Sequence, residues 1–304
     1  MSTSSRRTFL QTVGATAAAA LARPDVSGAI QPFRRRHGPH MKLSLAAYSY
    51  RAYLPDRRRS DQATKPMTLQ DFADECARLG LDGTELTSYY VPDPVPDGYL
   101  QRLRRHAFLQ GLTVSGTAIG NVFTHPPGAA RDREIAHTKQ WIDYAVQMGA
   151  PTIRIFAGSL QKGTTMEQAR TWCIEAIRVC CDYAASRGVI LALENHGGIV
   201  SRADDLLAIV RAIDSEWFGV NWDSGNVEGA DPYGELAKLA PYAVTAQIKT
   251  HIGREGARQP ADFARIVGIL KDVTYRGWLA LEYEDEADAK AAVPPLLDRL
   301  RKLI

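Results

Sequence analysis

The segment Val189-Ile-Leu-Ala-Leu-Glu-Asn-His196 is an apolar run of strand length that ends in a carboxylate, an amide and an imidazole. A continuous apolar run is typical of a strand buried on both faces, as in a parallel sheet. Three later segments also end in an acid or an amide: Phe218-Gly-Val-Asn-Trp-Asp223, Ala243-Val-Thr-Ala-Gln247 and Trp278-Leu-Ala-Leu-Glu282. Because α/β folds place their chemistry at the carboxyl ends of strands, these residues mark a candidate active-site rim.

Strand-like and helix-like segments alternate from Met41 to the C-terminus. The pattern predicts strands near residues 42–48, 82–87, 112–118, 151–156, 189–194, 217–222, 243–248 and 277–283. It predicts amphipathic helices near residues 68–80, 97–110, 130–148, 165–187, 202–213, 231–240, 259–271 and 286–303. Thr68 and Ser201 are expected helix caps, and four glycines stand where helices should stop: Gly80, Gly111, Gly149 and Gly188.

Eight βα units in succession predict the α/β fold class, as a single closed (β/α)₈ TIM barrel over residues 41–304. An open, doubly wound sheet is the alternative. It would usually carry a glycine-rich turn after the first strand, and Tyr48-Ser-Tyr-Arg-Ala-Tyr53 contains no glycine. The sequence therefore favours the barrel.

The first 22 residues have the pattern of an export signal. Ser5-Arg-Arg-Thr-Phe-Leu-Gln11 resembles the twin-arginine motif, and a mildly apolar stretch with a small-residue cleavage site, Ala20-Leu-Ala22, follows it. The apolar stretch is too short to span a bilayer, so no stable membrane anchor is expected. The sequence predicts delivery by the twin-arginine (Tat) export machinery to the periplasm or the extracellular space, with residues 23–40 as a linker.

Charge and cysteine content exclude two further classes of protein. Without Arg6 and Arg7 of the leader, 35 basic residues stand against 34 acidic residues, so no basic field for nucleic acid remains. The four cysteines lie in predicted helices without the spacing of a metal site or of a disulfide framework, so buried free thiols are expected. They are Cys76, Cys173, Cys180 and Cys181. The sequence leaves open whether the chain forms a homo-oligomer.

Glu194, Asp223, Gln247 and Glu282 occupy equivalent positions at the ends of the last four predicted strands. Three carboxylates facing one cavity repel one another unless they bind protons or a cation. Oxygen donors of this kind favour a hard divalent metal, with Mn²⁺ or Mg²⁺ ahead of Zn²⁺. The alternative is that these acids pair with arginine or lysine at the rim.

A family resemblance rests on four segments: Leu193-Glu-Asn-His-Gly-Gly198, Asn221-Trp-Asp-Ser-Gly-Asn226, Gln247-Ile-Lys-Thr250 and Leu281-Glu282. They resemble the sugar phosphate isomerase/epimerase family of xylose isomerase-like TIM barrels. The resemblance implies metal binding by Glu194, Asp223 and Glu282, and an acid/base role for Glu194 and Glu282. The chain departs from the family pattern at Gln247 and Asn226, where the family usually has histidines. Gln247 still offers a carbonyl oxygen, a weaker and neutral ligand.

Further residues near the strand ends are candidates for substrate binding. Glu85 is expected to hold a sugar hydroxyl or to pair with Arg154, and His196 to contact the substrate or to make a structural hydrogen bond. Lys249 is expected to steady an anionic oxygen or to pair with Glu282. His251 shares parity with Gln247 and is a candidate replacement for the missing imidazole. The remaining candidates are Asn226 and the loop residue Arg254.

The leading functional expectation is an exported, metal-dependent isomerase or epimerase of a sugar or sugar derivative. It would transfer a proton next to a carbonyl through a metal-stabilised enediolate. A lyase or hydrolase of 3-keto-glycosides, which expels a β-substituent from the same enolate, is the second candidate. A non-catalytic sugar-binding barrel is the candidate from another class.

Overall fold

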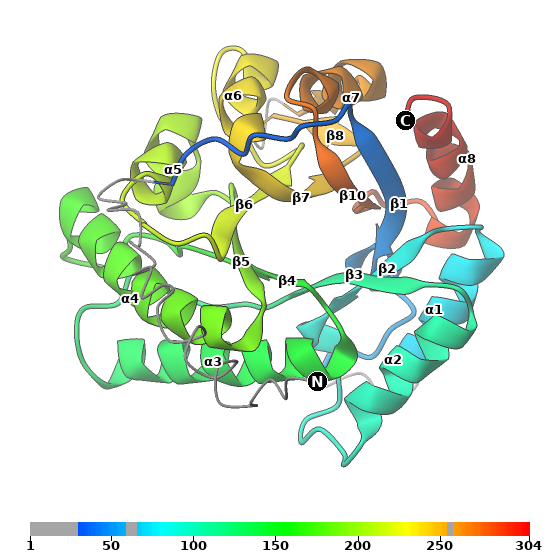
Figure 1. The fold of residues 1–304 in the computed structure, drawn as a ribbon, viewed down its shortest axis with the longest axis horizontal. Coiled ribbons are helices and arrows are strands. Elements are labelled where there is room, and N and C mark those ends of the chain that lie inside the picture. The colour runs from blue at the N-terminus through cyan, green and yellow to red at the C-terminus, as the bar shows by residue number, and fades with distance from the viewer. Residues whose placement is uncertain (1–29, 59–65, 254–257) are drawn as a thin grey trace, which may run out of the picture.

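The computed structural model describes residues 30–58, 66–253 and 258–304. Eight parallel strands form a closed barrel in the order β1-β10-β7-β6-β5-β4-β3-β2, with β1 pairing to both β10 and β2 (Figure 1). The strands are β1 (His40–Ala46), β2 (Gly83–Thr87), β3 (Thr113–Ala118), β4 (Thr152–Ile155), β5 (Ile190–Glu194), β6 (Phe218–Asp223), β7 (Ala243–Ile248) and β10 (Arg276–Leu281). The predicted fold class is confirmed, and each barrel strand overlaps a predicted one.

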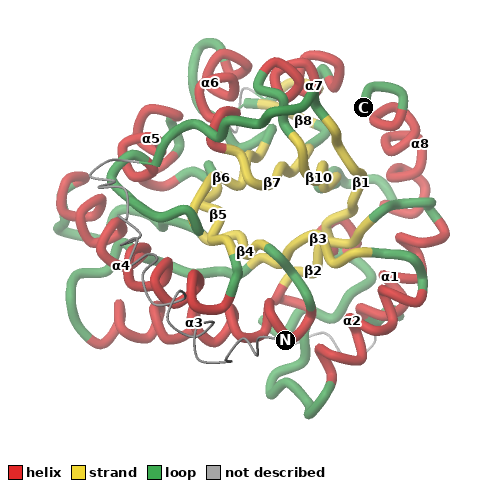
Figure 2. The backbone as a smooth tube through the Cα atoms, in the orientation of Figure 1, coloured by secondary structure: helices red, strands yellow, loops and turns green. Residues whose placement is uncertain are grey.

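Eight helices surround the strands, and Figure 2 shows them as an outer ring. They are α1 (Leu69–Arg78), α2 (Tyr99–Leu109), α3 (Ala129–Met148), α4 (Met166–Arg187), α5 (Ala203–Val210), α6 (Pro232–Leu239), α7 (Phe263–Asp272) and α8 (Ala289–Arg301). The four cysteines are buried free thiols, as expected, and each lies on the inner face of α1 or α4. Within the described residues, no helix is both long and apolar enough to span a bilayer.

Helix ends follow the local sequence signals in most places. Thr68 and Asp71 form a reciprocal capping box at the start of α1, and Gly149 and Gly188 end α3 and α4 in the left-handed conformation. Ser201 is not the cap of α5, because Arg202 holds that position and makes no side-chain cap bond.

The region between β7 and α7 differs most from the sequence prediction. Residues predicted to begin a helix at 259 instead form β9 (Gln259–Pro260), which pairs antiparallel with β8 (His251–Ile252). The helix starts at Phe263, because the Asp262 side chain accepts hydrogen bonds from the amides of Ala264 and Arg265. Asp262 thus supplies the start signal that the amphipathic pattern alone does not locate.

Residues 30–39, here called the N-terminal strap, lie against the barrel although the sequence places them in a linker. Their backbone bonds to residues that precede the strands: Ile30 N–H donates to Ile213, and Phe33 N–H donates to Pro241. Arg35 donates to the carbonyl of Ala243 and lies over the ring of Tyr275. The strap therefore follows the amino-terminal ends of β6, β7 and β10, and Figure 1 shows it passing α5, α6 and α7 on its way to β1.

Candidate active site

The polar residues expected from the sequence meet at one end of the barrel. Glu194 ends β5, Asp223 ends β6, Gln247 lies near the end of β7 and Glu282 directly follows β10. Since all eight strands are parallel, their carboxyl ends open at the same mouth. All four side chains are buried, from fully for Asp223 to 8% exposed for Glu282.

A cavity of about 280 Å³ opens at this mouth and is called the mouth cavity below. Acidic, basic and aromatic side chains together form its wall. The lining residues are Tyr48, Arg58, Tyr89, Arg154, Phe156, Glu194, His196, Lys249, Glu282 and Glu284. Asp223 and Gln247 lie beneath this layer, outside the lining set.

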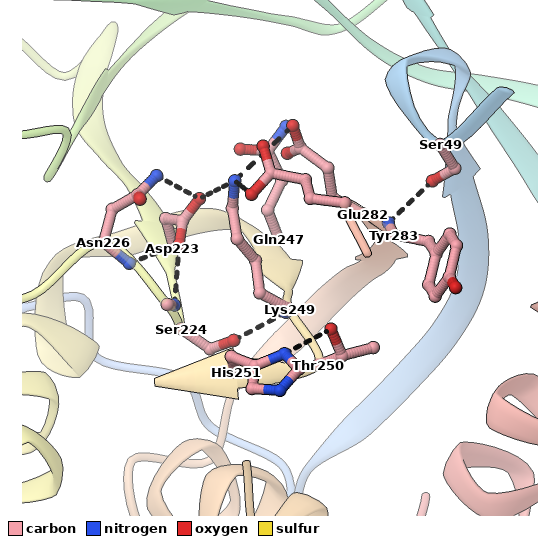
Figure 3. Close-up of polar contacts among 12 residues, drawn as sticks. Ser49, Asp223, Ser224, Asn226, Gln247, Lys249, Thr250, His251, Glu282 and Tyr283 are labelled. Atoms are coloured by element: carbon pink, nitrogen blue, oxygen red, sulfur yellow. Dashed lines mark hydrogen bonds and ion pairs between the residues drawn. The ribbon is translucent and has the colours of Figure 1, made fainter. Parts of the chain in front are cut away.

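Lys249 directly follows β7, and its side chain extends between Asp223 and Glu282 (Figure 3). Its Nζ lies 2.8 Å from Oε2 of Glu284, 3.5 Å from Oδ2 of Asp223 and 3.7 Å from Oε1 of Glu282. These four residues are called the Lys249 cluster. One ammonium is thus shared by three carboxylates, which confirms the expected pairing with Glu282 and adds two partners.

Arg154 on β4 gives Glu194 its charge partner. Its Nε lies 2.9 Å from Oε2 of Glu194, although the N–H is not aligned for a hydrogen bond. The guanidinium is fixed by a hydrogen bond to the carbonyl of Ile119 and by stacking 3.9 Å from the ring centre of Phe156. Arg154 therefore pairs with Glu194 and not with Glu85, the partner considered from the sequence.

Asn226 joins two of the acids. Its Nδ2 donates to Oε1 of Glu194 at 3.2 Å and to Oδ2 of Asp223 at 3.0 Å. Oδ1 of Asp223 accepts from the backbone amides of Gly225 and Asn226, so the loop after β6 folds around this carboxylate (Figure 3). Asn195 holds the same loop, because its amide donates to the carbonyls of Asp223 and Asn226.

Gln247 belongs to a buried chain of amides. Its Oε1 accepts from Nδ2 of Asn221 at 2.7 Å, and its Nε2 donates to Oε1 of Glu85 at 2.7 Å. Asn221 also donates to Glu194 at 3.3 Å, and within the described residues its own Oδ1 has no hydrogen-bond partner. Both polar ends of Gln247 are therefore committed to other side chains.

Burial controls the protonation of the site, because it penalises charge. It raises the pKa of Glu85 to about 7 and that of Asp223 to about 6, although Lys249 opposes the shift at Asp223. Burial also raises the pKa of Glu282, again against Lys249. For Lys249 burial acts to lower the pKa, but the neighbouring carboxylates, Asp223 first, outweigh it and leave the pKa above its usual value. Lys249 therefore remains an ammonium ion at neutral pH.

The predicted metal ligands do not fit a divalent ion as the chain arranges them. Among the described residues, no group of three or more His, Cys, Asp or Glu side chains is placed to hold a metal. The oxygens of Gln247 and Asp223 accept hydrogen bonds from protein amides, and Lys249 Nζ lies between Asp223 and Glu282. No chemical step is therefore assigned to a metal, and binding of Mn²⁺ or Mg²⁺ stays a prediction from the sequence.

Of three further predicted substrate-binding residues, the structure describes His251 and His196 but not Arg254. His251 is in β8, where its Nδ1 lies 3.0 Å from Asp285, and it is not among the residues that line the mouth cavity. His196 does line the cavity, with its ring 4.4 Å from that of Phe156. Arg254 lies outside the described residues, as does the leader of residues 1–22.

Sequence reasoning missed several residues of the site. Glu284 is the nearest partner of Lys249, and its parity with Glu282 was an available signal, because residues two apart in an extended chain share a face. Arg58 lines the cavity with its guanidinium 3.3 Å from the ring centre of Tyr89. No periodic pattern marks Arg58, which lies in a loop after an irregular segment. Asn221 carries no site signal of its own in the sequence, because its role as a donor to Glu194 and Gln247 depends on strand pairing.

A second cavity of about 400 Å³ adjoins the first and shares His196 and Glu284 with it. It lies over the loops that follow β5 and β6. Its other lining residues are Gly197, Ser201, Gly225, Asn226, Val227, Glu228, Gly253 and Arg258. The two cavities therefore meet at His196 and Glu284.

Comparisons with known proteins agree with this architecture. Residues 73–303 match the family model described as Xylose isomerase-like TIM barrel. Similar solved structures include a D-psicose 3-epimerase from Clostridium cellulolyticum H10 (TM-score 0.69, 17% identity, covering 86% of this chain and 99% of that chain). A 3-keto-D-glucoside 4-epimerase from E. coli (0.67, 15%, 86% and 99%) and a zinc-bound IolI protein (0.71, 17%, 87% and 99%) are also similar. No curated protein matches the chain in sequence. At such identities, the structural likeness shows the fold.

Proposed function

Because the chain belongs to the xylose isomerase-like TIM barrel family, we propose that it transfers a proton next to the carbonyl of a sugar or sugar derivative, as an isomerase or epimerase. One observation carries the proposal: Glu194 and Glu282 line the same cavity, and Arg154 and Lys249 line it with them. Two strands, β6 and β7, lie between β5 and β10 in the barrel, so the two carboxylates approach a bound molecule from different directions.

Glu282 is the better placed of the two acids to act as the base. Glu194 is held by Arg154, Asn221 and Asn226, whereas the Glu282 carboxylate pairs with Lys249 at 3.7 Å. In the proposed reaction, Glu282 removes the proton from the carbon next to the carbonyl, and the electrons of that C–H bond move onto the carbonyl oxygen. The raised pKa of Glu282 suits it to take a proton from carbon.

Lys249 and Arg154 supply the charge that the reaction needs. A developing enolate oxygen in the mouth cavity would accept a hydrogen bond from either cation, where exclusion of water strengthens the interaction. Protonation from the Glu194 side then gives the epimer or the isomer. No oxidant or reductant is consumed, because the C–H bond that breaks is replaced by a new C–H bond. This bond forms on the same carbon in the epimer, or on the former carbonyl carbon in the isomer, where a hydroxyl proton also moves from one oxygen to the other.

The adjoining cavity favours one alternative substrate. A glycoside could place its sugar ring in the mouth cavity and its second unit beside Asn226 and Arg258. For a 3-keto-glycoside the same enolate would expel the substituent on the next carbon, as a lyase does. This elimination is the second candidate function, and its products differ from those of epimerisation.

A single experiment separates these reactions. The protein is incubated in D₂O with free ketoses and, separately, with 3-keto-glycosides, and the products are followed by NMR. Deuterium on the carbon next to the carbonyl together with a new stereoisomer supports epimerisation, whereas release of an aglycone supports elimination. Glu282→Gln should slow either reaction by roughly 100-fold or more, and Glu216→Gln, at an exposed site, should not.

Two outcomes would contradict the proposal. If neither compound exchanges deuterium, and Glu282→Gln binds sugars as the wild type does, a non-catalytic sugar-binding barrel is the better description. If exchange occurs but survives both Glu282→Gln and Glu194→Gln, the acid/base assignment is wrong although the reaction class stands.

We also propose, from the leader sequence, that the protein is exported and that the reaction takes place outside the cytoplasm. The support for export is the arginine pair Arg6-Arg7 and the apolar stretch that follows, in a part of the chain that the structure does not describe. A folded barrel suits this route, since twin-arginine substrates are exported after folding. A small carbohydrate available outside the cytoplasm is therefore the proposed substrate.

A further inference from the structure

We infer that the ammonium of Lys249 is the resident cation of the acidic site, and that the native protein works without a divalent metal among these carboxylates. The nitrogen lies 3.5 Å from Asp223 and 3.7 Å from Glu282, the two predicted ligands on β6 and after β10. Glu284 is a third carboxylate partner of the same nitrogen, at 2.8 Å. Figure 3 shows the lysine side chain extending between Asp223 and Glu282.

The lysine side chain is built into the loop after β6. A methyl group at Gly225 would come within 2.9 Å of Cβ and Cδ of Lys249 and within 2.7 Å of the carbonyl oxygen of His251. The backbone amide of Lys249 donates to Oγ of Ser224 at 2.8 Å, and the amide of Ser224 donates to the carbonyl of Gln247. This loop therefore has room for the lysine stem and for little else.

The other predicted ligand atoms are occupied by protein donors. Oε1 of Gln247 faces the amide of Asn221, and Oδ1 of Asp223 faces two backbone amides. Oε2 of Glu194 lies beside Arg154. A metal could collect these oxygens only if the amide chain, the β6 loop and the Arg154 pair all rearranged. The chain instead provides two fixed cations, Arg154 and Lys249.

A lysine differs from a divalent ion in what it offers to a ligand. It carries one positive charge and three N–H donors, and it cannot be removed by a chelator. Its carboxylate partners orient the ammonium at the wall of the mouth cavity, which Lys249 itself lines. The inference that no divalent metal binds here is independent of the proposed reaction. The inference that Lys249 steadies an enolate oxygen rests on the proposed function.

The test compares metal binding by the wild type and by Lys249→Ala. Both proteins are purified without a polyhistidine tag and without chelators, and their metal content is measured by plasma mass spectrometry. Each is then titrated with Mn²⁺, Mg²⁺ and Zn²⁺ by calorimetry and by thermal unfolding. The wild type should carry no stoichiometric metal and show no metal-dependent change in Tm.

Lys249→Ala removes the ammonium and leaves three carboxylates around the vacated space. This variant should bind one divalent ion and gain roughly 5 °C in Tm at saturating Mn²⁺. Adding Asp223→Asn to Lys249→Ala should abolish that gain. Arg276→Ala, an exposed change at the opposite end of the barrel, serves as the control for nonspecific ion effects.

Two results would overturn the inference. The first is a wild type that binds one equivalent of metal and loses it on Glu282→Gln or Asp223→Asn. The second is a Lys249→Ala variant that folds but takes no ion, because then the lysine does not stand in an ion's place. If Lys249→Ala does not fold, the metal content and titration of the wild type decide alone. None of these readouts uses turnover, so failure of the proposed reaction would leave them unaffected.

Discussion

Gly225 follows β6 and packs against both the Lys249 side chain and the backbone of His251. Gly225→Ala should lower the free energy of unfolding by about 1–3 kcal/mol, because the added methyl has no space and the backbone oxygen cannot move aside cheaply. Chemical denaturation of the variant and the wild type measures the difference.

The matched control is Gly268→Ala in α7, where an added methyl meets no atom within 4 Å. That substitution should stabilise the protein by about 0.5–1 kcal/mol, since alanine favours the helix over glycine. Equal effects at the two positions would show that the space around Lys249 is less restricted than the distances indicate.

Glu85 is fully buried, and it accepts a hydrogen bond from Gln247 that a glutamine at position 85 could also accept. Its pKa is raised from the ordinary 4.5 to about 7, by burial first and then by Glu282. Between these values the unfolded chain releases the proton while the folded protein keeps it, so stability falls as pH rises. Glu85→Gln removes this loss.

We therefore expect Glu85→Gln to be more stable than the wild type at pH 8, by about 3 kcal/mol at most. The difference should shrink on acidification and vanish near pH 4.5. Denaturation curves at several pH values measure it, with the exposed Glu216→Gln as the control. A variant that is equally stable or less stable at pH 8 would mean that Glu85 stays ionised in the folded protein.

Helix α1 begins with a reciprocal cap in which the Thr68 hydroxyl accepts from the Asp71 amide, and Asp71 accepts from the Thr68 amide at 2.8 Å. Hydrogen bonds to the Asp71 carboxylate from the Thr68 amide first and then from the Thr68 hydroxyl, at 2.8 Å, lower the pKa of Asp71, and Thr68→Ala removes the second of these bonds. Thr68→Ala should cost about 1 kcal/mol at pH 7. A lowered pKa contributes stability that is lost as pH falls through the pKa of the folded protein, so the cost should shrink below about pH 4.

Urea denaturation at pH 7 and pH 3 measures this dependence. Thr171→Ala on the exposed face of α4 is the control, because its hydroxyl bonds only the carbonyl one turn earlier. An undiminished cost of Thr68→Ala at pH 3 would show that the Asp71 side of the cap contributes little.

Elements were more predictable from the sequence than their side-chain contacts. Buried strands of a parallel barrel are continuously apolar, and glycine marks the ends of α3 and α4, so local sequence was enough to locate them. Local sequence could not locate the start of α7, because the β8–β9 pair that precedes it forms between two segments that meet only in the folded chain. His251 does not share a face with Gln247, because β7 ends at Ile248 and His251 belongs to the separate strand β8.

The site was predictable to a similar extent. Glu194, Asp223, Gln247 and Glu282 all lie at or beside the carboxyl ends of their strands, at one mouth, as the parallel strand order requires. Which cation each acid meets could not be read from the sequence, because the pairs Arg154–Glu194 and Lys249–Glu284 depend on side-chain direction across the barrel. Glu85 was expected to hold a sugar hydroxyl or to pair with Arg154, and in the structure it accepts a hydrogen bond from Gln247.

At the level of the whole molecule, the proposed export depends on the leader that precedes the barrel. Replacing Arg6 and Arg7 by lysine should retain the protein in the cytoplasm of a host with a twin-arginine system, since that pathway requires the arginine pair. Cell fractionation with immunodetection measures the distribution, and Arg34→Lys with Arg36→Lys is the matched control. Secretion unaffected by the change in the leader would remove the basis for an extracytoplasmic role.

The N-terminal strap joins the barrel beside Ile213 and Pro241, at the amino-terminal ends of the strands. The mouth cavity opens at their carboxyl ends, so the point of attachment and the substrate entrance face away from each other. An enzyme tethered to a solid support or to a fluorescent reporter through residues before Ile30 would keep its entrance free.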